Sequence, residues 1–367
     1  MHDTEDKSIA VTDLVQLARL ALAGKPKDVQ LYVRRLINRY RITVPELAEQ
    51  LGVTLRDASK SSSPLRGAVV DAIPVDLDSR LQLARQEYPV FLDAEPVWSP
   101  EVREQLEQIV SERERESELN QAALHPTKTA VFTGAPGVGK TLAARWVAQR
   151  LNRPLITLDL AAVMSSFLGR TGNNVRNVLD YAKGVECIFL LDEFDAVAKR
   201  RDDAVEVGEL KRLVTVLLQE IDDWPSTGLL IAATNHPELL DPAVWRRFEV
   251  IIRFPMPNED QMTESIQRYI GTDEGSKGWS PILAKALSGM SFADAERELL
   301  RAKRQAVMQH QPLVSQLQRI VHARARGLPR EGRAQLALDL MAVGLSQRES
   351  HDWTGVSRDT IRKAASR

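Results

Sequence analysis

The sequence predicts an α/β fold in which a parallel sheet is flanked by helices, with a helical lid and small helical domains at both ends. Between Lys128 and about Pro255, five short apolar runs of strand length alternate with helical runs, as buried parallel strands do. Residues 257–311 then carry no strand pattern, and residues 9–57 show the apolar spacing of helices. The five runs are Thr129–Thr133, Leu155–Asp159, Cys187–Leu191, Leu229–Thr234 and Val250–Phe254.

The size and composition of the chain narrow the class of protein. Its 367 residues are enough for two or three domains, and 43% apolar with 27% charged residues is ordinary for a soluble globular protein. The net charge of −1 excludes a surface that binds nucleic acid along its whole extent, so only a local patch could do so. The single cysteine, Cys187, excludes an intrachain disulfide and is expected in the core.

The N-terminus and the hydropathy of the chain predict its location. The first residues lack the basic-then-apolar pattern of a signal peptide, and no apolar run reaches the length that spans a bilayer. We therefore expect a cytoplasmic protein with no membrane partner.

Residues 1–58 are predicted to form an N-terminal helical domain. Apolar residues recur at helical spacing over 11–22 and 31–37, and a third run begins near Thr43. Pro45–Thr54 resembles only the first half of a helix-turn-helix, so we interpret this domain as a docking or assembly domain. Serines and prolines make residues 59–95 a predicted linker or extended segment, and residues 99–124 are predicted to be helical, with a solvated charged face over Ser111–Glu118.

A phosphate-binding loop is predicted between the first strand and the helix after it. The sequence there has the form G-x-x-x-x-G-K-[ST] in a strand–loop–helix context. Its glycines let backbone N–H groups surround phosphates, and the helix N-terminus adds partial positive charge. Lys140 is expected on the β and γ oxygens and Thr141 on Mg²⁺. The predicted nucleotide-binding residues are Gly134, Ala135, Pro136, Gly137, Val138, Gly139, Lys140, Thr141, Leu142 and Asp192.

Two acidic residues follow the third predicted strand. Asp192 and Glu193 would lie at the carboxyl edge of the parallel sheet, where ligands bind. We expect Asp192 to hold Mg²⁺ together with Thr141, and Glu193 to orient and deprotonate the attacking water. Asp195 is expected to cap the next helix. The motifs therefore predict ATP hydrolysis with ATP and Mg²⁺ as bound groups.

Polar residues after the fourth strand complete the predicted site. Asn235 is expected to hydrogen-bond the γ-phosphate or the lytic water. Arg246 and Arg247 follow in an otherwise apolar turn. Either they form a surface ion pair, or they reach a phosphate in a neighbouring subunit, as arginines that stabilise a transferring phosphoryl group do.

These motifs, in this order and spacing, resemble those of the AAA ATPases. The Arg-Arg-Phe of Arg246–Phe248 is similar to the spastin and katanin relatives and to some bacterial AAA proteins. The resemblance covers about residues 96–311 and implies a nucleotide-binding domain over 96–256 and a helical lid over 257–312. It implies a ring of like subunits, commonly a hexamer, with Asn235 as first sensor and both arginines as arginine fingers.

The same resemblance implies a pore loop that grips a polypeptide. Phe167 would be the gripping aromatic, followed by Leu168 and Gly169, although a core phenylalanine is the alternative. Arg170 stands where many relatives carry an acidic residue. Residues 200–203 are a weaker candidate for a second pore loop. In the lid, residues 291–294 align only loosely with the second sensor.

The C-terminal residues 333–367, after a predicted basic linker over 313–332, resemble a helix-turn-helix. Gly355 would form the turn, and residues 313–367 hold ten basic and five acidic side chains. Ser350 and His351 depart from the usual motif, so docking on a partner or on the ring is the alternative to DNA binding. The candidate DNA contacts on the second helix are Arg358, Thr360, Arg362 and Lys363.

Three functions follow from these predictions. The first is an ATP-driven ring that remodels or threads a protein client. The second is a DNA-associated regulator that uses the C-terminal helices. The third is an ATPase switch subunit that serves a separately encoded effector, such as a protease or a defence protein, since the chain has no protease motif of its own.

Overall fold

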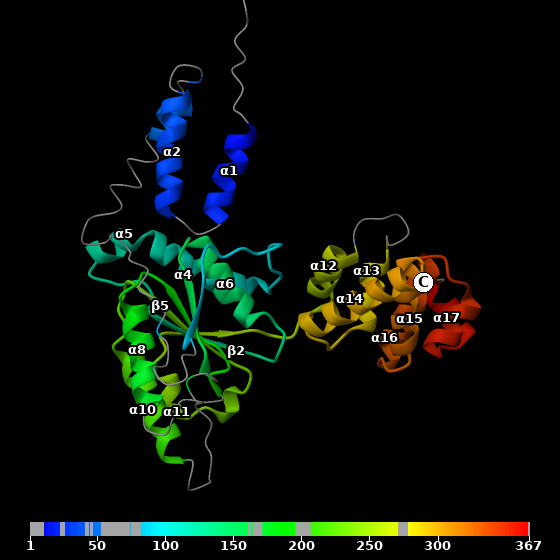
Figure 1. Cartoon of the computed structure of the whole chain (residues 1–367). Coiled ribbons are helices and arrows are strands. Elements are labelled where there is room, and N and C mark those ends of the chain that lie inside the picture. The colour runs from blue at the N-terminus through cyan, green and yellow to red at the C-terminus, as the bar shows by residue number, and fades with distance from the viewer. Residues whose placement is uncertain are drawn as a thin grey trace, which may run out of the picture. The chain divides into compact units, whose positions relative to one another are not determined.

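The computed structural model describes residues 11–22, 26–40, 44, 47–52, 74, 82–160, 163, 171–195, 207–270 and 278–365. Contacts divide the chain into two compact units, Met1–Ala72 and Ile73–Arg367. In the first unit, helices α1 (Val11–Leu22) and α2 (Pro26–Tyr40) precede a third helical stretch at residues 47–52 (Figure 1).

The second unit contains a six-stranded sheet. Its spatial order is β1-β3-β4-β5-β2-β6, and every strand except β1 is parallel to its neighbours. The carboxyl ends of β2, β4 and β5 therefore meet at one edge. The strands are β1 (Ala84–Glu87), β2 (Thr129–Thr133), β3 (Leu155–Leu158), β4 (Ile188–Leu191), β5 (Leu229–Thr234) and β6 (Val250–Arg253). The five predicted strands agree with β2–β6 to within one residue at each end.

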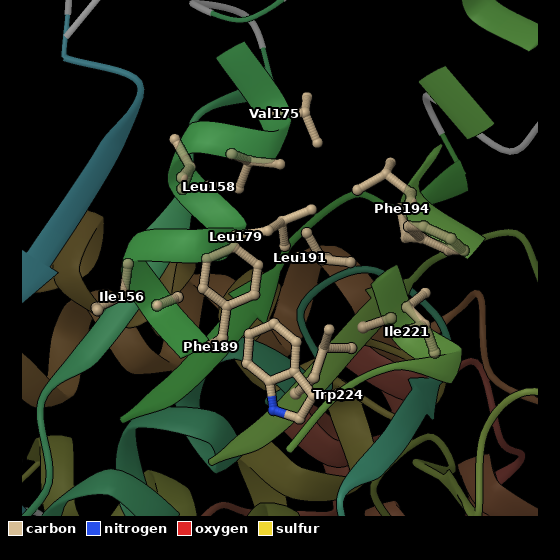
Figure 2. Packing of buried hydrophobic residues seen from close by; sticks show 14 of the residues in the cluster. Ile156, Leu158, Val175, Leu179, Phe189, Leu191, Phe194, Ile221 and Trp224 are labelled. Atoms are coloured by element: carbon tan, nitrogen blue, oxygen red, sulfur yellow. The ribbon is translucent and has the colours of Figure 1, made fainter. Parts of the chain in front are cut away.

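Both faces of this sheet are buried. Along β4, Phe189 and Leu191 pack into one hydrophobic cluster, while Ile188 and Leu190 pack into the other, because successive side chains of a strand point to opposite faces. The ring of Phe189 stacks on Trp224, with centroids 5.3 Å apart (Figure 2). This double burial explains why the strands read as continuous apolar runs.

Helices cover the two faces and connect the strands (Figure 1). One cluster includes residues of α8 and α10, and the other includes residues of α4 and α6. The elements of this part are α4 (Pro100–Glu114), α5 (Glu116–Gln121), α6 (Lys140–Arg150), α8 (Thr171–Lys183), α10 (Val207–Asp222), the 3₁₀ turn η1 (Pro237–Leu239) and α11 (Pro242–Trp245). Within the described residues, no helix has the length and apolar character needed to cross a membrane.

The strand β1 lies inside the segment 59–95 that was predicted as a linker or extended path. It pairs antiparallel with β3 at the edge of the sheet. Its sequence, Ala-Arg-Gln-Glu, has no apolar run because an edge strand is partly exposed and is commonly charged. The chain is therefore extended at Ala84–Glu87, one of the two predicted forms, but it is paired in the sheet rather than forming a linker there.

From Glu259 onward, the regular elements of the described residues are all helices. Helices α12 (Glu259–Ile270), α13 (Trp279–Ala286) and α14 (Phe292–Met308) form the predicted lid. They are followed by α15 (Leu313–Ala325), α16 (Arg330–Ala342), α17 (Gln347–Thr354) and α18 (Arg358–Ala365).

Residues 313–332, which were predicted to be a basic linker, are mostly helix α15. Leu317 and Val321 of this helix are fully buried in one cluster with Leu283 of the lid and Leu336 of α16. The basic residues that suggested a linker lie between these apolar positions. The lid and the C-terminal helices thus share one hydrophobic core.

Candidate functional site

The phosphate loop lies between β2 and α6, at the carboxyl edge of the sheet. Gly134 and Gly139 have positive φ angles of 150° and 100°. A Cβ atom on Gly134 would stand 2.3 Å from the carbonyl oxygen of Phe254, so glycine is required there. Helix α6 begins at Lys140, and its N-terminus carries the partial positive charge of the helix dipole.

Lys140 fills the centre of this loop and is only 6% exposed. Its Nζ donates to the carbonyl oxygens of Gly134 at 2.7 Å and Ala135 at 2.9 Å, and to Oδ1 of Asn235 at 2.7 Å. Burial lowers the pKa of Lys140, and the charges of Asp192 and Asp195 act in the opposite direction. The structure therefore joins the predicted lysine and the predicted sensor asparagine directly.

The acidic pair stands next to the loop. Thr141 Oγ1 donates to Asp192 Oδ2 at 2.9 Å, and the backbone N–H of Glu193 donates to Asp192 Oδ1 at 3.0 Å. Glu193 is exposed and has a φ of 51°, a left-handed conformation that is uncommon for a glutamate and that occurs at functional sites. Its carboxylate is thus held outside the strand rather than in the core.

Asp195 makes contacts that the sequence did not indicate, while the helix that it was expected to cap lies outside the described residues. Its Oδ1 accepts hydrogen bonds from Thr234 Oγ1 at 2.8 Å and from the backbone N–H of Asn235 at 3.1 Å. It therefore joins the end of β4 to the end of β5.

A cavity of about 920 Å³ surrounds these groups. The phosphate loop, Asp192, Glu193 and Asn235 line one part of it, and the lid residues Arg268 and Tyr269 line another. Burial and then a hydrogen bond to Glu296 raise the pKa of Tyr269 to about 12. The backbone N–H of Ala293, at the start of α14, donates to Gly137 O at 3.2 Å. The lid residues that aligned only loosely with a sensor thus touch the phosphate loop.

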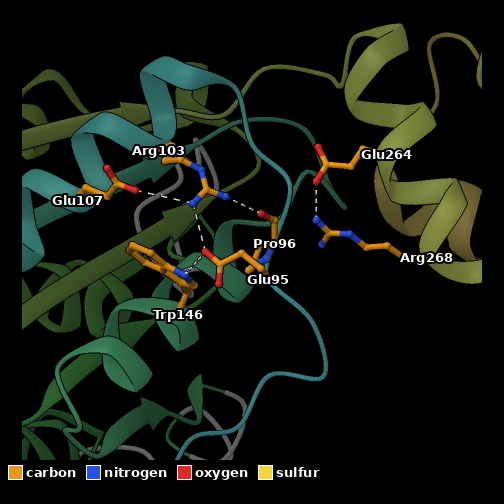
Figure 3. Close-up of polar contacts among 7 residues, drawn as sticks. All are labelled: Glu95, Pro96, Arg103, Glu107, Trp146, Glu264 and Arg268. Carbon is orange, nitrogen blue, oxygen red and sulfur yellow. Dashed lines mark hydrogen bonds and ion pairs between the residues drawn. The ribbon is translucent and has the colours of Figure 1, made fainter.

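The sequence did not indicate that residues 91–98 form a wall of this cavity. Glu95 Oε1 accepts from Arg103 at 3.1 Å and from Trp146 Nε1 at 2.9 Å, which fastens the wall to α4 and α6 (Figure 3). Trp98 packs edge-on against Trp146, with centroids 5.6 Å apart, and its Nε1 lies 3.1 Å from the position of a Cβ on Gly139. No local motif marks such a wall, because its partners are far along the chain.

Arg246 and Arg247 follow the short helix α11 and do not line the cavity. Arg247 donates through Nε to Asp222 Oδ2 at 2.9 Å and through Nη1 to the carbonyl oxygen of Ala243 at 2.8 Å. Arg246 is exposed, and its side chain makes no ion pair or hydrogen bond with the residues that the structure describes. The two arginines, equivalent in the sequence motif, therefore have different environments.

The other predicted contacts lie elsewhere or outside the described residues. Phe167, Leu168 and Gly169 fall outside the described residues, as does the weaker candidate at 200–203. In the lid, Arg297 is exposed and pairs with Asp294 instead of reaching the cavity.

The C-terminal candidates lie on α18 and are exposed. Arg362 pairs with Asp359 at 3.1 Å, and Thr360 N donates to Ser357 Oγ at 3.2 Å at the start of the helix. Gly355 has a φ of 67° and ends α17, as expected of the turn. The two departures in α17 differ: Ser350 is fully buried and its hydroxyl has no hydrogen-bond partner among the described residues, whereas a hydrogen bond of 2.7 Å joins His351 Nδ1 and the carbonyl oxygen of Val356.

The fold and the site define a class of protein. The phosphate loop follows β2, the acidic pair follows β4, and the polar sensor follows β5, which lies between them in the sheet. This arrangement binds a nucleoside triphosphate. A sequence model of the ATPase family associated with various cellular activities (AAA) matches residues 130–256.

An uncharacterised AAA family ATPase of Sinorhizobium fredii is 31% identical over 327 residues, which are 87% of this chain and 96% of that protein. The chain therefore belongs to the AAA family, and it is an ATPase that binds and hydrolyses ATP.

Similarity extends to the proteasome-activating nucleotidases of archaea. That of Methanococcus maripaludis is 33% identical over 210 residues, which are 54% of this chain and 51% of that protein. Nucleotidase 1 of Haloferax volcanii is 30% identical over 227 residues, 59% of this chain and 54% of that protein. The chain thus spans about half the length of these nucleotidases.

Proposed function

We propose that this ATPase works as a ring of like subunits and that each site is completed by the next subunit. The observation that carries the proposal is Arg246. It is exposed, it has no partner among the described residues, and it stands outside the cavity of its own chain. An arginine placed for another subunit's phosphate has these properties.

The cavity itself supports an incomplete site. Three cationic side chains line it: Lys140, Arg145 and Arg268. Arg145 is bound to Glu87 at 2.6 Å, and Arg268 is bound to Glu264 at 2.6 Å. Among the described lining residues, only Lys140 is thus a cationic side chain without a carboxylate partner, which leaves room for an arginine from a neighbouring subunit.

Within the site, we assign roles by position. Lys140 binds the β and γ oxygens, Glu193 activates the water, and Asn235 orients the water or the γ-phosphate. The loop residues 134–142 surround the phosphates with backbone N–H groups.

The donor set at Thr141 and Asp192 fits Mg²⁺. Both supply hard oxygen atoms, and their 2.9 Å separation matches the roughly 2.9 Å between adjacent oxygens of an octahedron with ~2.05 Å bonds. The ion, when bound, would neutralise charge on the β and γ oxygens. In the structure these two residues are already held together by their hydrogen bond.

Mixed rings test the shared site. Arg246→Ala subunits keep an intact cavity, and Glu193→Gln subunits keep an intact arginine. Each variant alone is expected to lose ATP turnover by at least about a thousandfold, the scale of an arginine finger. Mixing them should restore part of the turnover, because some interfaces pair a good cavity with a good arginine. A mixture as inactive as its parts would contradict the shared site.

Arg247→Ala is the matched comparison for Arg246→Ala. Because Arg247 is held by Asp222 and Ala243 within its own chain, we expect its loss to affect turnover less, and complementation by Glu193→Gln subunits to be weaker. Equal behaviour of both variants would mean that both arginines reach the neighbouring site.

We further propose that the client of the ring is a protein. The support is the similarity to proteasome-activating nucleotidases together with the aromatic–aliphatic–glycine sequence at Phe167–Gly169. Phe167→Ala is expected to keep ATP hydrolysis and to lose remodelling of the client. A tagged Glu193→Gln protein, purified with ATP and Mg²⁺, should retain that client. Capture of a separate enzyme in constant proportion would instead favour the switch-subunit function.

A DNA-associated function is the second candidate, and α18 favours it. Arg358 and Arg362 are exposed on this helix. Arg362→Ala with Lys363→Ala should weaken DNA retention and reduce the salt dependence by about one to two phosphate contacts. Arg301→Ala with Arg304→Ala, on exposed positions of α14, removes the same charge elsewhere. Equal retention by both double variants would reject α18 as the DNA contact.

A further inference from the structure

Phe194 and Asp195, which follow the acidic pair, connect the ends of β4 and β5. The parallel ladder of β4 and β5 pairs Leu191 with Ala232. Beyond that pair, Phe194 N donates to Ala233 O at 2.8 Å, and the side chain of Asp195 then binds both Thr234 and Asn235. The connection therefore continues past the end of the strands and reaches the sensor residue itself.

The contact fixes the backbone of Asn235. Its N–H donates to Asp195 Oδ1, while the hydroxyl of Thr234, a residue only 1% exposed, donates to the same oxygen. Thr234 Oγ1 in turn accepts from the N–H of His236 at 3.0 Å. One carboxylate oxygen thus determines the path of the chain on both sides of Asn235.

The side chain of Asn235 is oriented by its other contact. Lys140 Nζ has only donors, so the amide oxygen of Asn235 must face it, at 2.7 Å. The amide Nδ2, a donor, then points away from Lys140. A donor in this position suits a γ-phosphate oxygen or the lone pair of the attacking water, provided that the backbone beneath it does not shift.

We propose that Asp195 is a positioning residue for ATP hydrolysis, which acts by holding the backbone of Asn235 so that its amide is correctly aimed. The proposal rests on the role of Asn235 in the proposed function. Asp195 itself does not line the nucleotide cavity, whereas Asn235 does. Its effect on turnover is therefore transmitted through Asn235.

A double-mutant cycle on the full chain tests this. Asp195→Ala and Asn235→Ala are each expected to lower kcat about ten- to a hundredfold, and both should leave ADP affinity, measured by calorimetry, within about twofold. The two changes together should cost little more than Asn235→Ala alone, because the aimed group is already gone. Asp195→Asn keeps an acceptor oxygen and should recover most of the lost turnover. Asp223→Ala, at an exposed acidic residue, controls for the loss of one negative charge.

If Asp195→Ala does not fold, a second variant can test the proposal. Thr234→Val removes one of the two hydrogen bonds to Asp195, and it should lower kcat in the otherwise unchanged protein but not in Asn235→Ala. Losses that multiply in the double variants would overturn the proposal, since Asp195 would then act independently of Asn235. Lower stability with unchanged kcat would also overturn it, because the contact would serve the fold alone. If Asn235→Ala is fully active, the assigned role of Asn235 fails first, and normal nucleotide turnover in that variant identifies this case.

Discussion

The helices at the two ends of the chain are held in different ways. At the C-terminal end, Leu317, Val321 and Leu336 are fully buried in the same cluster as the lid residue Leu283. At the N-terminal end, a buried carboxylate holds the helices: Asp13 of α1 accepts hydrogen bonds from three side chains of α2. Those donors are Tyr32, Arg39 and Tyr40.

The C-terminal helices are therefore an extension of the lid, whereas the N-terminal helices belong to a separate compact unit. Because α15 and α16 complete the lid's own core, a partner bound on α17 or α18 is attached to the element that lines the nucleotide cavity. Residues Met1–Ala72 form a separate compact unit. The C-terminal helices are expected to be coupled to ATP binding because they pack on the lid.

Truncation gives the largest test of this difference. Removing residues 313–367 takes Leu317, Val321 and Leu336 out of the lid core and leaves apolar surface on Leu283 and Leu299 exposed. We expect aggregation or an unfolded lid, with loss of ATP binding. Removing residues 1–72 should leave ATP binding intact. Circular dichroism and calorimetry with ADP measure both, and a folded, ATP-binding 1–312 fragment would contradict the shared core.

A single substitution in the shared core is expected to have the next largest effect, on the free energy of unfolding. Leu317→Ala should lower the free energy of unfolding by about 2–5 kcal/mol, because it leaves a cavity in a fully buried site. Leu14→Ala, at a position that is 54% exposed on α1, should change it by less than about 0.5 kcal/mol. Urea unfolding of both variants provides the comparison. Similar losses would show that α1 buries Leu14 against a partner.

Much of this could be predicted from the sequence, and what could not has a common cause. The strands β2–β6, the phosphate loop and the acidic pair are local patterns, so a short window contains each of them. The strand β1 was missed because its pairing with β3, rather than its own composition, makes it a strand. Helix α15 was read as a linker because its basic residues obscured the buried positions Leu317 and Val321.

The candidate site shows the same limit. Arg246 and Arg247 are alike in the motif, and they are distinguished by the contacts of Arg247 with Ala243 and with Asp222, which lies 25 residues before it. The contacts of Asp195 with Thr234 and Asn235, at the end of β5, could not be predicted because these residues are about 40 positions further along the chain. Each of these distinctions depends on contacts between distant segments, which spacing along the chain does not encode.

An ion pair between the lid and α16 offers a smaller test. Lys285 of α13 binds Asp339 of α16, and it lies 3.5 Å from Glu259. Lys285→Ala should destabilise the lid by about 1–2 kcal/mol, since the pair is mostly buried. Arg362→Ala removes a comparable but exposed pair on α18 and should cost less than about 1 kcal/mol. If added salt abolished the difference between the two variants, screening rather than burial would explain it.

The smallest expected effect concerns Asp13 and is confined to the N-terminal unit. The hydrogen bond from Tyr40 lowers the pKa of Asp13 below its ordinary 3.8, assisted by Tyr32 and Arg39, although burial acts in the opposite direction. A carboxyl with a lowered pKa stabilises the folded state above its unfolded pKa, and this contribution disappears as the pH falls through the folded pKa.

The difference in stability between the unchanged protein and Asp13→Asn should therefore be constant from pH 7 to about 5 and should shrink only below about 3.8. Hydrogen exchange of the α1 and α2 amides measures it. Because the hydrogen bonds of Asp13 are with side chains of α2, ATP turnover at pH 7 is expected to be the same in both proteins. A change in turnover in Asp13→Asn would instead couple the N-terminal helices to the ATPase site, and the contrast between the two ends of the chain would no longer hold.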